Sequence, residues 1–597
     1  MAYLSSLQTA YRTILGGVFL AVLAPAIGSG GEPTSRPLLR IEGQMHTEAI
    51  RRIATDRANR LMVSVSSDKT LRLWKLPSGK LWKTFRVPLA AGQEGKLQAV
   101  AVSAGGGVIA VSGHTGRSWE RKKGYFIYFF DTLTGKMKRV IGGLPSTARH
   151  LAFSKDSRYL AVALSEKGGV RVYQVRDGRL LRQDDRYEKD TTWVDFDHEG
   201  RLVTASLDGA LRLYNNRFLL IHKRDISADH KPYSAVFSPN GKRIAVGFLN
   251  RSSVAVFSGK GLDLLYFPDA SAAIGDFRTV AWSADGHSLY GAGSHRNRHL
   301  RQIRWWKNEG KPSASGRGEF VDFPVASSTL SHILPLKGGG TLFCGAQPIL
   351  GALDSQGFTL FRHKNPSLSF SSWKRDLLIS ADGSVVHFPY DDTGKNRGLF
   401  SVRHLSLTHV ADATQLLPPL TQSSTLTVTG WNRQFGQLKL NGRRLVLKER
   451  ERANALSFAR DGRFFVVGTS HALRMFDQLG RSRWEIPVSS SVRGVTISLD
   501  GRVILAAHAD GTLRWYQVVQ GRLFLTLFPH RDRKRWIAWT PDRFFAASSG
   551  GDQLIGWHKN QGRHQAAKFI PANTFRKHYY RPDRIRQLFS GTTGGPS

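Results

Sequence analysis

Short runs of apolar residues recur along most of the chain and are separated by turns of Asp, Asn and Gly. In the clearest stretch, apolar and polar positions alternate over 49–54, 61–65, 71–75 and 81–85, with polar turns between these runs. Alternation with a period of two predicts β-strands, and turns at such short spacing join strands into antiparallel sheets. Residues 46–85 are therefore predicted to form one four-stranded sheet.

The turn before the second strand of this unit recurs towards the C-terminus. Copies lie at 106–107, 156–157, 199–200, 240–241, 285–286, 461–462, 500–501 and 541–542, with weaker ones at 338–340 and 375–376. Most intervals are close to the ~40–45 residues of one propeller blade. The double-length interval from Asp376 to Asp461 is predicted to hold one degenerate unit around 405–448. About twelve units result, too many for one ring of 4–8 blades.

The unit from His46 to Trp74 resembles the WD40-repeat family. In that family a His, a Ser or Thr, an Asp and a Trp form a hydrogen-bonded structural tetrad. The matching positions are His46, Ser64, Asp68 and Trp74. The resemblance implies an all-β fold of tandem WD40-type β-propellers, with about twelve or more four-stranded blades in two rings.

Most other units depart from this tetrad. Tyr173, Tyr214 or Phe476 stands where the family has Trp, and the His is often missing. Patterning is therefore expected to hold those blades, and the tetrad is predicted for one blade alone.

The C-terminal region carries a second resemblance. Several segments are similar to the closing part of bacterial WD-repeat proteins that often continue into a caspase-like peptidase domain. They are Arg535–Asp542, Phe544–Gly551, Ile555–His558, Phe569–Ala572, Phe575–Arg576 and Tyr579–Asp583. No Q-A-C-x-G signature is found, and Cys344 lies inside a repeat. The resemblance implies the propeller part of that architecture without the peptidase. A separate caspase-like peptidase is therefore one candidate partner.

The N-terminus has the pattern of a secretory signal peptide. Arg12 precedes the apolar run 14–23, and Ala24 and Ala26 form an A-x-A site. The apolar run is shorter than the ~20 residues of a membrane span, and no later segment approaches that length. The protein is predicted to be periplasmic or secreted, with no integral span in the mature chain; a cytoplasmic location is the alternative.

The predicted organisation has five parts. They are a signal peptide (1–28), a linker (29–37), a first WD40 propeller (38–365), a second (366–570) and a basic, aromatic C-terminal tail (571–597). Residues 37–41 are expected to supply an outer strand to a late blade, because an unpaired sheet edge is a liability.

Charge adds a second functional hypothesis. The chain has 86 Lys and Arg against 45 Asp and Glu, a net charge of +41. Such an excess favours anionic partners, namely envelope polysaccharide, anionic lipid, nucleic acid or an acidic protein. A single cysteine excludes a disulfide framework and a Cys-based metal site.

Three basic segments are candidate partner-binding sites. Two are predicted turns or loop edges, where binding residues concentrate, and the alternative for both is a solvated loop. The third, the tail, is either a cap on the last blade or a docking segment. The candidate residues are Arg296, Arg298, Arg301, Arg531, Arg533, Lys534, Arg535, Arg576, Tyr579, Tyr580 and Arg581.

No local motif for catalysis is found. The chain has no G-x-S-x-G elbow, no P-loop and no H-E-x-x-H, and the His295/His299 pair lies in an Arg-rich predicted loop. No catalytic residue, cofactor or metal is predicted. The leading hypothesis is a non-enzymatic exported scaffold whose propeller faces bind protein partners, such as an envelope complex. The alternatives are a polyanion-binding module and an enzyme with a propeller-face site.

Overall fold

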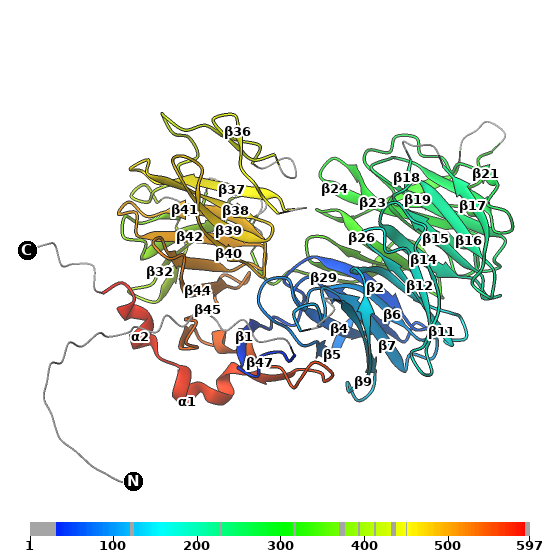
Figure 1. Cartoon of the computed structure of the whole chain (residues 1–597), viewed down its shortest axis with the longest axis horizontal. Coiled ribbons are helices and arrows are strands. Elements are labelled where there is room, and N and C mark those ends of the chain that lie inside the picture. The colour runs from blue at the N-terminus through cyan, green and yellow to red at the C-terminus, as the bar shows by residue number, and fades with distance from the viewer. Residues whose placement is uncertain are drawn as a thin grey trace, which may run out of the picture.

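The computed structural model describes residues 31–119, 124–226, 230–313, 318–368, 370, 376–391, 394–410, 413–431, 437–448 and 451–590. The predicted signal peptide and the first two residues of the predicted linker lie outside these residues. The described chain forms twelve antiparallel sheets, nine of them with four strands. Two groups of sheets are seen side by side in Figure 1. The fold is therefore all-β, as the strand pattern predicts.

The first group is a ring of seven four-stranded blades, each built from consecutive strands. The strands are β2 (Ile50–Thr55), β3 (Leu61–Ser66), β4 (Thr70–Lys75) and β5 (Lys80–Arg86) in blade 1; β6 (Leu97–Val102), β7 (Val108–Gly113), β8 (Tyr125–Asp131) and β9 (Met137–Leu144) in blade 2; β10 (Ala148–Phe153), β11 (Tyr159–Leu164), β12 (Val170–Gln174) and β13 (Leu180–Asp184) in blade 3; β14 (Thr191–Phe196), β15 (Leu202–Ser206), β16 (Ala210–Tyr214) and β17 (Leu220–Asp225) in blade 4; β18 (Lys231–Phe237), β19 (Arg243–Leu249), β20 (Val254–Ser258) and β21 (Leu264–Tyr266) in blade 5; β22 (Thr279–Trp282), β23 (Leu289–Asn297), β24 (Leu300–Trp306) and β25 (Phe320–Ala326) in blade 6; and β26 (Leu330–Pro335), β27 (Thr341–Gly345), β28 (Ile349–Leu353) and β29 (Thr359–Lys364) in blade 7. A short 3-10 helix, η1 (Asn308–Gly310), follows β24.

Packing, not a shared strand, closes this ring. Ile53 and Met62 of blade 1 share one buried core with Leu342 and Cys344 of blade 7. The ring therefore runs from Ile50 to Lys364, and it begins later than the predicted residue 38 because the preceding strand belongs to another sheet.

The second group holds four further blades. Its strands are β30 (Leu378–Ile379), β31 (Val385–Pro389), β32 (Arg397–Ser401) and β33 (Ser406–Thr408) in blade 8; β34 (Val428–Thr429), β35 (Lys439–Leu440) and β36 (Arg443–Arg444) in blade 9; β37 (Ala453–Phe458), β38 (Phe464–Thr469), β39 (Ala472–Asp477) and β40 (Ser482–Pro487) in blade 10; and β41 (Val492–Ile497), β42 (Val503–His508), β43 (Leu513–Gln517) and β44 (Leu523–Pro529) in blade 11, whose sheet is extended by β45 (Trp536–Trp539) and β46 (Phe545–Ala547). Buried clusters join blade 9 to 10, 10 to 11, and 11 back to 8. We call this group of four sheets the second ring.

The twelfth sheet joins distant parts of the chain, and we call it the joining sheet. It contains β1 (Leu38–Ile41), β47 (Ile555–Lys559) and β48 (Lys568–Pro571), with β1 antiparallel to β47. The predicted edge strand at 37–41 thus pairs with a late strand, but in a separate sheet that does not close either ring. The helical elements η2 (Gly551–Leu554), η3 (Ala572–Phe575), α1 (Arg576–Tyr579) and α2 (Pro582–Gln587) lie beside it in sequence.

A short local pattern explains why the blade turns recur. In five turns a Ser hydroxyl donates to the carboxylate or amide oxygen two residues later, which fixes a tight polar corner after the strand. The pairs are Ser154–Asp156, Ser238–Asn240, Ser283–Asp285, Ser380–Asp382 and Ser498–Asp500. In blade 8 this turn follows β30, and the position predicted for it at 375–376 is therefore wrong.

Candidate functional site

The tetrad of blade 1 is complete in the structure. His46 Nδ1 lies 2.8 Å from Asp68 Oδ2, and His46 Nε2 lies 2.8 Å from Ser64 Oγ. The Trp74 indole N–H donates to the same Ser64 Oγ at 2.8 Å. All four side chains are buried. The network ties the segment before β2 to β3 and β4, so its role is structural.

Burial and pairing set the protonation of this network. Burial lowers the pKa of His46, although Asp68 opposes that effect. Burial alone would raise the pKa of Asp68, but the contact with His46, the charge of Arg72 and the Thr70 hydrogen bond together outweigh burial and lower it. The network therefore places the ionised carboxylate of Asp68 beside a His46 imidazole that is harder to protonate than a free one.

Blade 4 carries an equivalent network that the sequence prediction missed. The Tyr187 hydroxyl lies 2.8 Å from Thr204 Oγ1 and 2.8 Å from the Tyr214 hydroxyl, which donates to Asp184 Oδ2 at 3.0 Å. Tyr187 stands four residues before the first strand of its blade, as His46 does in blade 1. That spacing is the signal that identifies it; the residue types hide it.

The basic run in blade 6 is not a loop, which corrects the prediction. β23 and β24 pair up to Asn297 and Leu300, so only Arg298 and His299 form the turn. Backbone pairing outweighs the polar composition here. Arg296 and Arg298 are exposed, whereas the guanidinium of Arg301 donates to Ser294 O at 2.7 Å.

His295 and His299 do not come together. His295 is buried and its Nε2 lies 3.2 Å from Asp322 Oδ2, whereas His299 is exposed at the hairpin turn. Within the described ranges, no group of three or more His, Cys, Asp or Glu residues is placed to hold a metal ion.

The second basic run forms the loop between β44 and β45 and lies against blade 8. The backbone N–H of Arg531 donates to Pro366 O at 2.9 Å, and Arg533 Nη1 donates to Asn396 Oδ1 at 2.6 Å.

 Two hydrogen bonds hold this loop against the start of the second ring. One is the 2.9 Å bond from Arg531 N to Pro366 O, and the other runs from His409 Nε2 to Arg533 O at 2.7 Å. The side chain of Arg535 pairs with Asp532 at 2.6 Å, while Lys534 is exposed. This run therefore acts mainly as an internal brace.

The C-terminal tail packs on the last strands. Tyr579 lies against Trp557, with ring centroids 4.8 Å apart, and Tyr580 lies against Phe545 at 5.6 Å. Arg576 pairs with Asp552 and covers the ring of Tyr580, and Arg581 pairs with Asp583. Ile585 and Phe589 are buried in the core shared by blades 8 and 11. The described part of the tail, which extends to Ser590, packs as a cap, the first of the two predicted alternatives.

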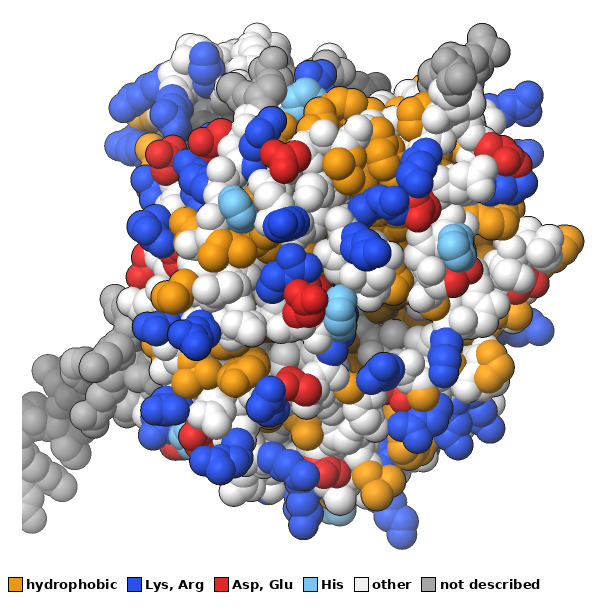
Figure 2. All heavy atoms as spheres, turned by 90° about the vertical axis from the view of Figure 1, so that its right-hand side faces the viewer, with side chains coloured by type: hydrophobic (Ala, Val, Ile, Leu, Met, Phe, Trp, Pro, Cys, Tyr) orange, Lys and Arg blue, Asp and Glu red, His pale blue; other side chains and the backbone are white. Residues whose placement is uncertain are grey.

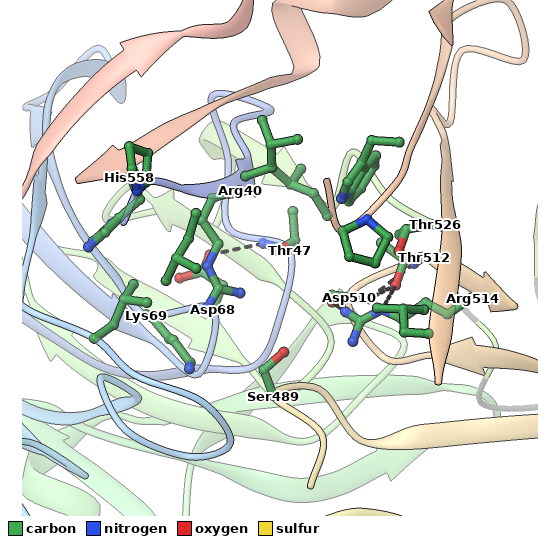
Figure 3. A pocket seen from close by; sticks show the side chains of 18 of the residues that line it. Arg40, Thr47, Asp68, Lys69, Ser489, Asp510, Thr512, Arg514, Thr526 and His558 are labelled. Atoms are coloured by element: carbon green, nitrogen blue, oxygen red, sulfur yellow. Dashed lines mark hydrogen bonds and ion pairs between the residues drawn. The ribbon is translucent and has the colours of Figure 1, made fainter. Parts of the chain in front are cut away.

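A cavity of about 590 Å³ lies where the joining sheet meets both rings. β1 supplies one wall: Leu39 and Ile41 pack into the core with Phe528 and Phe545, and Arg40 points from the opposite face of the strand. Figure 3 shows Arg40, Lys69 and His558 on one side and Asp510, Thr512 and Arg514 across from them. The lining segments are up to about 500 residues apart in sequence, so no local motif marks this site.

A second cavity of about 400 Å³ adjoins the first, since Glu48 and Ser67 line both. Its basic lining residues are Arg51, Lys96, His114, Arg452, His471 and Arg493. Glu48 is the one acidic residue of this lining, and Lys96 Nζ lies 3.8 Å from its Oε2. Burial raises the pKa of Glu48 and lowers that of Lys96. Both spaces between the rings are therefore predominantly cationic.

Comparison with known proteins identifies the repeat. The family model for the WD40 repeat (WD domain, G-beta repeat) matches residues 36–75, which contain β1 and the first three strands of blade 1. No curated protein matches the chain. Among the described residues, no helix is long and apolar enough to span a membrane. Together with the repeated four-stranded sheets, the match shows a WD40-type β-propeller fold.

Proposed function

We propose that this protein is a non-enzymatic scaffold that binds protein partners through the loops and faces of its two propellers. WD40 repeats are typical of protein-interaction surfaces, and the observation that carries the proposal is that the joining sheet contacts both rings. A rigid pair of rings presents both sets of loops in one arrangement, which lowers the ordering cost of binding a large partner.

Polar contacts of the joining sheet support this attachment. The amide of Asn560 bonds to both backbone groups of Leu89, with Leu89 N donating at 3.0 Å and Leu89 O accepting at 2.9 Å. Arg72 Nη2 lies 2.8 Å from Glu42 Oε1, and Arg86 pairs with the other carboxylate oxygen. Directly between the rings, Gln93 Nε2 donates to Val488 O at 3.2 Å.

Affinity capture from the native extract tests the proposal. The intact protein is expected to recover a protein partner in stoichiometric amount. Asn560→Ala should weaken recovery of a partner that contacts both rings, while Gln356→Ala, in an exposed turn of blade 7, serves as the matched control. Absence of any stoichiometric partner would contradict the proposal.

Export is part of the same proposal and rests on the pattern of residues 14–26. Envelope and cytosolic fractions are compared, and the recovered protein is sequenced from its N-terminus. A start shortly after Ala26 in the envelope or secreted fraction is expected. A cytosolic protein that retains Met1 would contradict export.

Polyanion binding is the second candidate function, favoured by the surface charge. Figure 2 shows Lys and Arg side chains spread over one face of the molecule, with fewer Asp and Glu side chains among them. Retention on an anionic matrix should fall steeply with salt if several phosphate or sulfate contacts form together. Arg296→Gln with Arg298→Gln removes two exposed charges and should lower retention, whereas Arg581→Gln removes a charge already paired with Asp583. Retention that does not change with salt would exclude this candidate.

A further inference from the structure

The cavity between the rings contains a guanidinium, that of Arg40, which forms no ion pair with the described residues. Arg40 Nε is buried and has no hydrogen-bond partner, and no ion pair reaches this side chain within the described part of the chain. Burial and the nearby charge of Arg514 lower the pKa of Arg40 to about 10. A buried charge without a partner is costly, so this site favours the arrival of an anion.

Two acidic residues of the cavity, Asp68 and Asp510, are already engaged with other groups. Asp68 pairs with His46, and Asp510 Oδ2 lies 2.6 Å from Arg514 Nη2 while its Oδ1 accepts the Thr512 hydroxyl at 2.6 Å. These two carboxylates are held by contacts within their own blades, and neither forms an ion pair with Arg40.

Lys69 adds a second buried cation to the same wall. Its ammonium donates to two carbonyl oxygens, Ala90 O at 3.2 Å and Gly92 O at 2.9 Å, and no carboxylate pairs with it. Burial lowers the pKa of Lys69, and the charge of Arg40 lowers it further. Carbonyl oxygens orient this ammonium without neutralising it, so two mutually repelling cations share one cavity.

The rest of the lining combines charge with an apolar surface. Further cations are Arg36, Arg522 and Arg543, and the apolar residues include Leu38, Leu89, Leu523, Trp539 and Pro541. A volume of about 590 Å³ is in the range of small-molecule sites. The lining therefore suits a ligand with an anionic head and a hydrocarbon or aromatic body.

We propose that this cavity binds a small organic oxyanion, with its phosphate, sulfate or carboxylate head on Arg40 and its apolar body against Trp539 and the leucines. A guanidinium donates two parallel N–H bonds to such a head, which an ammonium does not. The ligand joins groups from β1, blade 1 and blade 11, and it therefore adds a bond between the rings. This assignment goes beyond the scaffold function and does not depend on the identity of a protein partner.

Calorimetry and thermal unfolding with two probes test the assignment. The full chain is titrated with phenyl phosphate and with inorganic phosphate. Phenyl phosphate is expected to bind more tightly, because only it reaches the apolar lining, and to raise Tm in proportion to its binding. Equal affinity for both probes would overturn the organic body of the ligand, and no saturable binding of either probe at millimolar concentration would overturn the site itself.

Variants identify the residues responsible. Arg40→Met keeps the length of the side chain and should weaken phenyl phosphate binding about tenfold or more, while Arg40→Lys should give an intermediate affinity. Arg522→Gln, at an exposed lining position, provides a milder test that does not alter the interior and should weaken binding about twofold to fivefold. Arg217→Gln, in an exposed turn of blade 4, is the control and should bind as the unmodified protein does. Unchanged affinity in Arg40→Met and in Arg522→Gln would overturn the proposal.

Discussion

Blade 1 and blade 4 solve the same structural problem with different residues. Blade 1 joins its first segment to its inner strands through His46, Ser64 and Trp74, and blade 4 does so through Tyr187, Thr204 and Tyr214. The buried polar atoms find partners in both. A tetrad search therefore finds one blade where the structure shows two, because geometry is retained while residue type changes.

The two blades also differ in how they neutralise the arginine of their third strand. Arg212 Nη2 of blade 4 lies 2.9 Å from Asp208 Oδ2, four residues earlier in the same blade. The equivalent Arg72 of blade 1 pairs with Glu42, which lies outside the ring after β1. Blade 4 is thus electrostatically self-contained, whereas blade 1 depends on the segment that leads from the joining sheet.

Removing the carboxylate of Glu42 should produce the largest difference between blades 1 and 4. Glu42→Gln leaves Arg72 and Arg86 without their counter-ion, and breaking a buried ion pair costs about 3–5 kcal/mol. Hydrogen exchange should accelerate in β3 and β4 and in the joining sheet. Asp208→Asn is the matched change and should accelerate exchange in blade 4 alone. Equal exchange in blade 1 with and without Glu42 would show that this blade does not depend on it.

The two aromatic residues give a smaller contrast. Trp74→Phe removes the N–H that reaches Ser64 and should destabilise blade 1 by about 1–3 kcal/mol. Tyr214→Phe should cost about 1 kcal/mol, since Tyr187 keeps its bond to Thr204. Urea unfolding measures both, with Trp82→Phe at a 37% exposed position as the control. A larger loss for Tyr214→Phe would reverse the order expected for the two networks.

The smallest expected differences between blades 1 and 4 lie in how their stability depends on pH. Burial lowers the pKa of His46, so its contribution to stability is present above the unfolded value of about 6.5 and is lost as the pH falls below it. Burial raises the pKa of Tyr187 to about 12, so its contribution is present below about 10 and is lost as the pH rises towards 12. Blade 1 should therefore weaken in acid, and blade 4 in alkali.

Thermal unfolding of matched variants measures these opposite trends. The Tm difference between the unmodified protein and His46→Gln should shrink below pH 6.5, and the difference for Tyr187→Phe should shrink above pH 10. Differences that stay constant across these ranges would mean that neither group titrates with folding.

The repeat was predictable where local chemistry decides the structure. Turns such as Ser154–Asp156 follow from side-chain bonds within a few residues, and the strands of blade 1 lie within a residue or two of their predicted bounds. Blade 9 was expected as a degenerate unit, and its three strands have two residues each. Pattern recognition fails there because such strands are too short for alternation to appear.

The cavity could not be predicted from the sequence. Arg40 comes from β1, whereas Asp510 and Trp539 come from blade 11 and its extension, and only the pairing of β1 with β47 brings them together. The exposed basic runs were more visible in sequence, yet Arg531 and Arg533 contact the protein itself. Clusters of charged residues in the sequence occur both at exposed positions and at internal contacts. A site built from distant segments can be located only when the pairing of the strands is known.

The pairing of β1 with β47 also sets an order of events during synthesis. Leu38 is made early, but its partner His558 follows only after both rings have been translated. Blades of the first ring can assemble from neighbouring residues, while β1 must wait for the C-terminal region. Closing so long a loop adds only about 0.6 kcal/mol for each doubling of its length, so the delay is one of time more than of stability. Until then Arg40 has no cavity to line, and the small-molecule site exists only in the finished chain.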